Sequence, residues 1–374
     1  MNWVAVASAA LDQRGLPDVV PGVETIVLPV IPSEPRGLAG EYSDLWLRLV
    51  DGPVSNDDLT EDEQAVVRDY ADAGIASNDV DDPLRVTTLD KPWLSSPLHE
   101  LAYGLISRLS AARGIDVVFI KGPALHRQGL RPNEHSGDID VWVDAARVTE
   151  LASLLEPWGW SHLNERWETS PLYHSVTMLP GRWGCEIDLH RHMPGFSTSD
   201  RESLQLLLSD AQTWNYAGVP TRVPSRHAHA VVGALHLMRP QQGRPVNPWN
   251  REQAITTLRE GGSEALDFAK RVGAGPALGE VLTAAFPGED DAVCGPVPLN
   301  WRWRAEPDRL KRYIIMFRAT PLRSWPRMAF RSVWPETNIA LRLDQLYGGT
   351  TKSPAKARLR RIVRGILQQL HLRD

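Results

Sequence analysis

The alternation of hydrophobic and polar positions predicts strands and short helices in the middle of the chain. "DVVFI" (116–120) reads as a buried strand, and "PALHRQGL" (123–130) as a short helix with proline at its first position. "DIDVWV" (138–143) is a second strand, followed by a helix to about residue 156. "LYHSVTMLPGRWGCEIDLHRHM" (172–193) reads as a hairpin around "PGR". This order of elements predicts an α+β fold with a mixed sheet and flanking helices.

The two flanking regions differ from the middle in their periodicity. Before residue 84, a strand in "ETIVLPVIP" accompanies two amphipathic helices in "GEYSDLWLRLVDGP" and "LTEDEQAVVRDYADAGI". From residue 225 onward helical runs follow one another, and the tail "KSPAKARLRRIVRGILQQLHLRD" reads as a basic amphipathic helix. We therefore expect a small winged-helix-like domain over 1–83, a core over 84–224 and a helical domain over 225–374.

Composition narrows the class of protein. A net charge of −5 over 374 residues argues against a surface that coats nucleic acid. Two cysteines cannot build a disulfide framework, which fits a reducing interior. The apolar run near the start has no basic segment before it, and no apolar stretch approaches the roughly 20 residues of a membrane span. We expect a cytoplasmic protein with no membrane partner.

Acidic residues on two predicted strands suggest a metal site. Asp138 and Asp140 are two residues apart, so they share one face of their strand and repel each other unless a cation offsets their charge. In "CEIDLHRH", Glu186, Asp188 and His190 likewise share one face. If the two strands are neighbours, Asp188 completes a carboxylate triad for Mg²⁺ or Mn²⁺, the arrangement used in two-metal phosphoryl and nucleotidyl transfer. Glu186 is the alternative third acid.

The turn between the first core strand and its helix suggests a phosphate site. Lys121 supplies a positive charge there, and Gly122 precedes a helix whose first N–H groups suit an anion. In the hairpin, His174 falls opposite His190 if three residues form the turn, or opposite Leu189 after a slip of one residue.

The unit "IKGPAL…SGDIDVWV…GCEIDLHRH" resembles the uncharacterised bacterial nucleotidyltransferases of the polymerase-beta-like superfamily, over roughly Pro97 to Gly365. The resemblance implies a polymerase-beta-like core and magnesium-dependent transfer of a nucleoside monophosphate from an NTP. It departs from the family pattern at Pro123, which replaces a Gly or Ser and removes both a hydroxyl and an N–H. The arginine that often precedes Gly-Asp-Ile-Asp is also missing. The residues that it implies are Asp138, Asp140 and Asp188 for metal binding and catalysis, Lys121, Gly122 and Gly137 for the nucleotide phosphates, and His190 and Glu186 as accessory groups.

The N-terminal region is similar, through "LPVIPSEPRGLAGEYSDLWLRLVDGPVSNDDL…VRDYADAGIAS", to PqqD-like domains that bind leader peptides. That similarity implies a ribosomally made peptide as the acceptor, in preference to an RNA. Three alternatives stay open: a toxin-like tRNA nucleotidyltransferase, a phosphotransferase on the same scaffold, and a peptide-binding module whose catalytic core has decayed.

Overall fold

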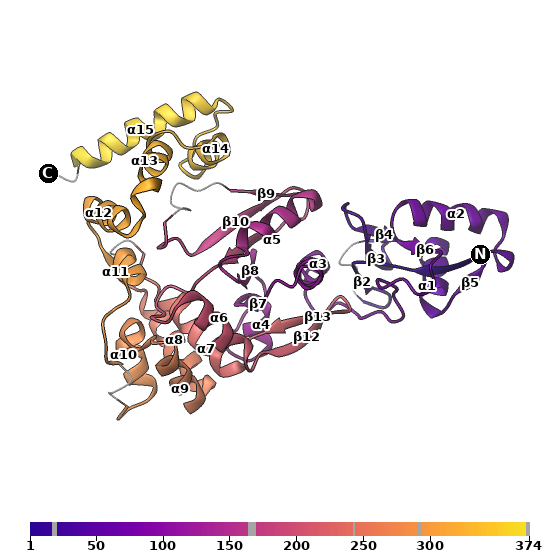
Figure 1. Cartoon of the computed structure of the whole chain (residues 1–374), viewed down its shortest axis with the longest axis horizontal. Coiled ribbons are helices and arrows are strands. Elements are labelled where there is room, and N and C mark those ends of the chain that lie inside the picture. Colours follow the sequence, from indigo (N-terminus) through magenta and orange to yellow (C-terminus); the bar gives the residue numbers. More distant parts are fainter. Residues whose placement is uncertain (17–20, 164–169, 242–243, 290–292, 372–374) are drawn as a thin grey trace.

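The computed structural model describes residues 1–16, 21–163, 170–241, 244–289 and 293–371. Its N-terminal part holds two small sheets and two helices (Figure 1). In one sheet β1 pairs antiparallel with β5 and β6, and in the other β3 lies between β2 and β4. The bounds are β1 Asn2–Ala5, β2 Ala9–Asp12, β3 Thr25–Leu28, β4 Arg36–Leu38, α1 Glu41–Asp51, β5 Val54–Ser55, α2 Glu61–Asp72 and β6 Ala76–Ser77.

Both helices predicted for this part are confirmed. The α2 helix begins with a capping box, in which the Thr60 side chain accepts from the Glu63 N–H and the Glu63 carboxylate accepts from the Thr60 N–H. Trp46 of α1 is fully buried and its indole donates to the Ile75 carbonyl at 2.8 Å. The sequence pattern missed β1 and β2, because strands of four residues give too little alternation to separate them from an irregular apolar run.

A five-stranded mixed sheet forms the core, in the order β7-β8-β11-β10-β9. Strands β8 and β11 are parallel, and every other neighbouring pair is antiparallel. The expectation of a mixed sheet with flanking helices is confirmed. The bounds are α3 Pro97–Ala112, β7 Val117–Ile120, α4 Gly122–Arg127, β8 Asp138–Val143, α5 Val148–Leu155, β9 Trp160–His162, β10 Ser175–Pro180, β11 Glu186–His190, α6 Asp200–Leu208, β12 Gln212–Tyr216 and β13 Val219–Val223.

The two faces of this sheet carry different chemistry. On one face the apolar residues of β8 and β11 form one core cluster with α3, α5, the β12–β13 hairpin and the strands β2 and β3. On the other face the acidic residues of the same strands alternate with them, and Trp142 of β8 packs with the helices that follow β13. The pleat therefore separates a dry face from a polar face that looks toward the C-terminal helices.

The β10–β11 hairpin is present, but its register differs from both expected alternatives. Ser175, not His174, pairs with His190, and Thr177 pairs with Asp188. His174 lies one step beyond the ladder, where its carbonyl accepts the Arg191 N–H at 2.9 Å. The three-residue turn was wrong: the last paired positions are Met178 and Ile187, one step away from the register that such a turn would give, and a shift of one residue moves every pairing.

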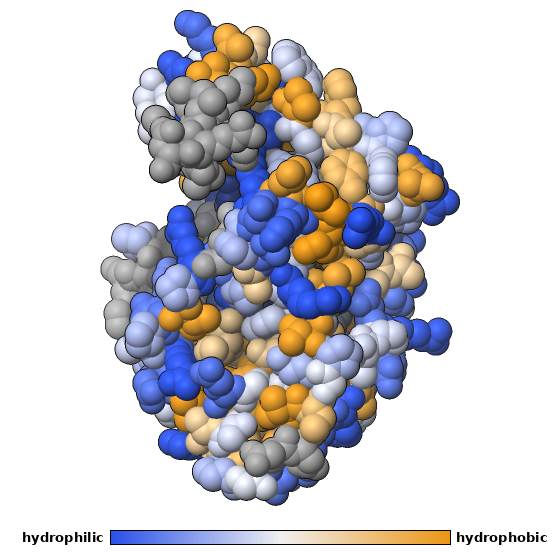
Figure 2. All heavy atoms as spheres, turned by 90° about the vertical axis from the view of Figure 1, so that its left-hand side faces the viewer, coloured by the Kyte–Doolittle hydropathy of each residue, from blue (hydrophilic) through white to orange (hydrophobic). Residues whose placement is uncertain are grey.

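Helices make up the described part of the chain after β13, as expected. Many large apolar side chains of its last helices are exposed, and Figure 2, which faces the left side of Figure 1, shows hydrophobic and hydrophilic groups interspersed there. Within the described residues, no helix combines the length and apolar character needed to cross a bilayer. The bounds are α7 Arg226–Met238, α8 Pro248–Gly261, α9 Ser263–Arg271, α10 Gly275–Ala285, α11 Leu299–Ala305, α12 Arg309–Ala319, α13 Trp325–Val333, α14 Thr337–Leu346 and α15 Pro354–His371.

Candidate active site

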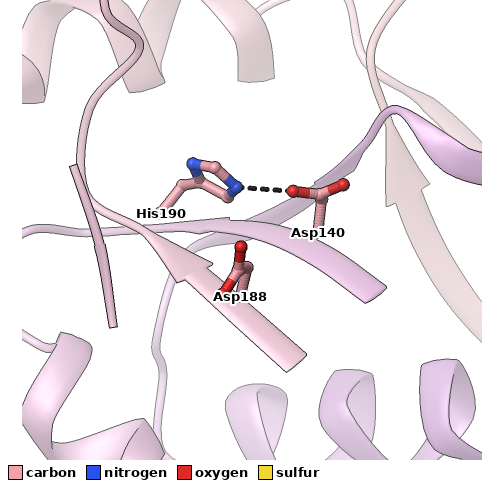
Figure 3. A group of neighbouring side chains, drawn as sticks. All are labelled: Asp140, Asp188 and His190. Carbon is pink, nitrogen blue, oxygen red and sulfur yellow. Dashed lines mark hydrogen bonds and ion pairs between the residues drawn. The ribbon is translucent and has the colours of Figure 1, made fainter. Parts of the chain in front are cut away.

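The parallel pairing of β8 with β11 places the predicted acidic residues side by side. Asp188 is the register partner of Asp140, and Glu186 that of Asp138, so all four start from the same face of the sheet. Figure 3 shows the side chains of Asp140, Asp188 and His190 gathered above the two strands. One ligand atom from each of these three lies within 4.8 Å of the others. The strands β8 and β11 are therefore neighbours, the condition under which the sequence predicted a site for a metal ion.

Asp140 is the most tightly held of the carboxylates. It is buried, and its Oδ1 accepts from Lys121 Nζ at 2.6 Å and contacts His190 Nε2 at 2.6 Å. Lys121 Nζ also lies 3.3 Å from His190 Nε2. Burial by itself would raise the pKa of Asp140, but the Lys121 ammonium and the His190 hydrogen bond together hold that pKa well below its ordinary value. Asp140 is therefore an anion with two partners of its own.

The other three predicted acidic and accessory groups have separate partners. Asp138 accepts from Ser136 Oγ at 3.0 Å, and burial and the nearby Asp140 raise its pKa. Asp188 accepts from Thr177 Oγ1 at 2.6 Å. Glu186 forms an ion pair with Arg342 of α14 at 2.9 Å, which directs it away from the cluster. Asp138 and Glu186 thus lie on the predicted face but outside the closest group of ligand atoms.

Lys121 has an unusual backbone conformation at the end of β7. Its φ of 62° and ψ of −149° lie in a region that is essentially restricted to glycine and that costs about 1–3 kcal/mol. Its N–H donates to His229 Nε2 at 2.6 Å, and His229 Nδ1 lies 2.8 Å from Gln128 Oε1. Burial lowers the pKa of His229 to about 3, so the imidazole is neutral and can accept at Nε2. The strained turn aims the ammonium at Asp140.

The predicted phosphate turn has fewer free backbone N–H groups than expected. Gly122 has a φ of 52°, and a Cβ there would lie 3.2 Å from Tyr103 Oη, so glycine is required on both counts. Gly137 has open space around it. The Lys121 N–H is already bonded to His229, and Pro123 has no N–H. The turn therefore offers fewer backbone donors to a phosphate than the family pattern implies.

Several residues near the site were not predicted from the sequence. His229 is buried, and its bond to Lys121 gave no sequence signal. The ring of His174 lies 5.2 Å from that of His190, centroid to centroid. Arg239 and Arg304 each approach one ring nitrogen of His174. Because His174, Arg239 and Arg304 are far apart in the sequence, no local sequence pattern predicts that they lie together.

The residues on this face fit a divalent cation. Asp140 and Asp188 offer carboxylate oxygens and His190 a ring nitrogen, close enough together to ligate one ion. Burial, and after it the nearby Asp140, raises the pKa of Asp138, and a cation beside these carboxylates would offset both effects. The two oxygens suit magnesium, and a nitrogen beside them makes manganese equally suitable. Asp140, Asp188 and His190 would hold the ion, with Asp138 at its edge.

Comparison with known proteins gives a family match for the part of the chain that carries this site. No curated protein matches the chain. One solved structure that resembles it is MenT4, a nucleotidyltransferase toxin from Mycobacterium tuberculosis H37Rv, with 14% identity, a TM-score of 0.24 and coverage of 63% of this chain and 89% of that one. A TM-score this low supports no conclusion about this chain. Residues 98–248, which contain Lys121 and all four residues of the acidic face, match the family model described as "Uncharacterised nucleotidyltransferase".

Proposed function

We propose that this protein is a magnesium-dependent nucleotidyltransferase that moves a nucleoside monophosphate from an NTP to an acceptor hydroxyl or phosphate and releases pyrophosphate. The observation that carries the proposal is the grouping of Asp140, Asp188 and His190 on one face of the parallel β8–β11 pair. This face lies inside the segment that matches the nucleotidyltransferase family model. Its core would be the polymerase-beta-like variant of the mixed sheet.

The chain's own groups have distinct parts in this reaction. The bound magnesium ion would supply Lewis-acid stabilisation of charge on the transferred phosphate. Asp140 and Asp188 would hold the ion, and Asp138, whose raised pKa lies nearer neutrality than that of an ordinary aspartate, would accept the proton of the acceptor hydroxyl. Lys121 orients Asp140 through the 2.6 Å contact and keeps it anionic.

The proposed acceptor rests on a different part of the chain. The similarity of residues 1–83 to PqqD-like domains supports a peptide as the acceptor, and α1 and α2, which carry that similarity, are both formed. Mass spectrometry of candidate acceptors after incubation with NTP and magnesium separates the alternatives. A whole added nucleotide indicates nucleotidyl transfer, and one added phosphate indicates a phosphotransferase.

Calorimetric titration of ATP and GTP, with and without magnesium, tests the core of the proposal. Wild type should bind a nucleotide only with the metal, and Asp140→Asn should weaken that binding at least tenfold because a metal ligand loses its charge. Asp116→Asn is the matched control, since Asp116 lies just before β7 and pairs with Arg222 on a half-exposed surface. Equal metal-dependent binding by wild type and Asp140→Asn would reject the proposed site.

A further inference from the structure

Two arginines from the helical region meet at one histidine of the core. Arg239, which caps the end of α7, places Nη1 3.3 Å from His174 Nε2. Arg304 of α11 places Nη2 3.0 Å from His174 Nδ1. We call Arg239, Arg304 and His174 the basic cluster. Both guanidinium groups are thus fixed against the two sides of one imidazole ring.

The histidine cannot satisfy both arginines. Burial and the neighbouring Arg304 hold the pKa of His174 well below its ordinary value, so the ring is neutral. A neutral imidazole has one acceptor nitrogen and one N–H. One of the two guanidinium groups therefore faces an N–H instead of an acceptor, and the cluster holds at least one donor without a partner.

Further polar atoms around the cluster are also unpaired. The buried Nε of Arg304 has no hydrogen-bond partner, and neither do His190 Nδ1 and His192 Nε2. The His192 ring lies 6.4 Å from that of His174, and the His190 ring 5.2 Å. Buried polar atoms in folded proteins are almost always bonded, and a guanidinium nitrogen can only donate, so the unpaired Arg304 Nε calls for a ligand that accepts hydrogen bonds.

The positive charge of the cluster is not balanced by the protein. Among the residues that the structure describes, no carboxylate lies within ion-pair distance of Arg239 or Arg304. Burial, together with the charge of Arg239, lowers the pKa of Arg304 to about 10. Arg304 remains cationic at neutral pH. An anion is therefore the chemical class of ligand that this place would take.

The basic cluster adjoins the acidic face. His190 contacts Asp140 at 2.6 Å on one side and stacks edge-on toward His174 on the other. A molecule that reaches both the acidic face and the basic cluster needs one group that binds a metal ion and, close to it, a second group that is negatively charged. The triphosphate of an NTP has this form, and the turn at Lys121 has lost two of its backbone donors, the Lys121 N–H to His229 and that of position 123 to proline.

We propose that Arg239 and Arg304, separated by His174, bind the terminal phosphates of the NTP. This assignment rests on the proposed function. The planar fork of arginine pairs with phosphate oxygens through two parallel hydrogen bonds, so two arginines can hold the β- and γ-phosphates. A phosphate of the acceptor offers the same chemistry, and the experiment below separates the two sources.

The test measures binding of tripolyphosphate, ATP with magnesium, and AMP with magnesium by calorimetry. The variants are Arg239→Gln, Arg304→Gln and Arg304→Lys, with Arg302→Gln as the matched control, because Arg302 is an exposed arginine on the same helix. Each Gln variant should weaken tripolyphosphate and ATP binding about tenfold to hundredfold, as expected for the loss of charge-assisted hydrogen bonds. Arg304→Lys should recover part of this loss, and Arg302→Gln should change it less than about twofold.

The outcomes decide separately on the subsite and on the reaction. Equal tripolyphosphate affinity in wild type and Arg304→Gln, with both folded by circular dichroism, overturns the subsite, as does a wild type that does not bind tripolyphosphate. An AMP loss as large as the ATP loss also overturns it, since the arginines would then hold a different phosphate. Arginine-dependent tripolyphosphate binding that persists in Asp140→Asn supports the subsite, even if metal-dependent nucleotide binding fails and the proposed function with it.

Discussion

Two charged groups, one buried and one partly buried, lie next to each other in this molecule and differ in how their charge is balanced. On the acidic face Asp140 has the Lys121 ammonium and a histidine within 2.6 Å. In the basic cluster Arg239 and Arg304 share a single neutral imidazole. The first group is stable as it stands, whereas the second holds charge that only a ligand would balance. Stability measurements can therefore separate the acidic face, which we expect to stabilise the fold, from the basic cluster, which we propose to bind phosphate.

The largest effect is expected where a balanced pair is broken. Asp140→Asn leaves the Lys121 ammonium, whose side chain is 9% exposed, without its anion. We expect the free energy of unfolding in urea to fall by about 3–5 kcal/mol, the usual cost of leaving one partner of a buried ion pair alone. Asp116→Asn, which breaks the half-exposed pair with Arg222, should cost less than about 1 kcal/mol. Similar losses in the two variants would show that the buried Asp140–Lys121 ion pair stabilises the fold no more than the half-exposed Asp116–Arg222 pair.

An intermediate effect is expected at Glu100, a buried carboxylate with no cation. Its oxygens accept from the N–H groups of Trp93, Leu94 and Ala217, and burial raises its pKa to about 7 from an unfolded value of 4.5. The folded protein thus holds a proton that the unfolded chain releases, so stability should fall as pH rises from about 4.5 to 7. The contribution is about 3 kcal/mol across this window.

Urea unfolding of wild type and Glu100→Gln at several pH values between 4.5 and 7.5 checks this prediction. The difference between the two proteins isolates Glu100 from the buried histidines, whose lowered pKa values act in the opposite direction. The wild type should lose stability relative to Glu100→Gln as pH rises. A constant difference would mean that the three N–H donors already keep the carboxylate ionised at low pH.

The smallest effect is expected where the charge is unbalanced. Arg304→Gln removes a buried cation that has no anionic partner, so the unfolding free energy without ligand should stay within about 0.5 kcal/mol or rise. Addition of tripolyphosphate should raise the melting temperature of wild type more than that of the variant at the same ligand concentration. A loss of stability comparable to that of Asp140→Asn would make Arg304 a structural residue and remove the contrast between the two groups.

The sequence predicted the acidic face well because its signals are local. Alternation along two strands was enough to place Asp138 with Asp140 and Asp188 with His190, and the structure has these strands as neighbours. The assignments of metal and phosphate roles to these residues and to Gly122 and Gly137 stay predictions. Register across the hairpin failed by one residue, since the length of a turn is only weakly encoded in its composition.

The basic cluster could not be predicted, because nothing local marks it. Arg239 and Arg304 look like ordinary surface arginines of two amphipathic helices. Only tertiary packing brings them to His174, where the two guanidinium groups meet at one imidazole ring. The same holds for His229, whose hydrogen bond to the Lys121 N–H depends on the docking of α7 against α4.

The span of these contacts also determines when the site is completed as the chain folds. The bond from Lys121 to His229 joins residues 108 apart, and that from Arg304 to His174 joins residues 130 apart. Contacts of such long range form slowly and late, after the local elements exist. During synthesis the strands β8 and β11 are made before α7, which carries both His229 and Arg239, and before α11, which carries Arg304. The Lys121 turn beside the carboxylates and the Arg239 side of the proposed triphosphate site would thus be completed together, when α7 docks, and the Arg304 side would follow.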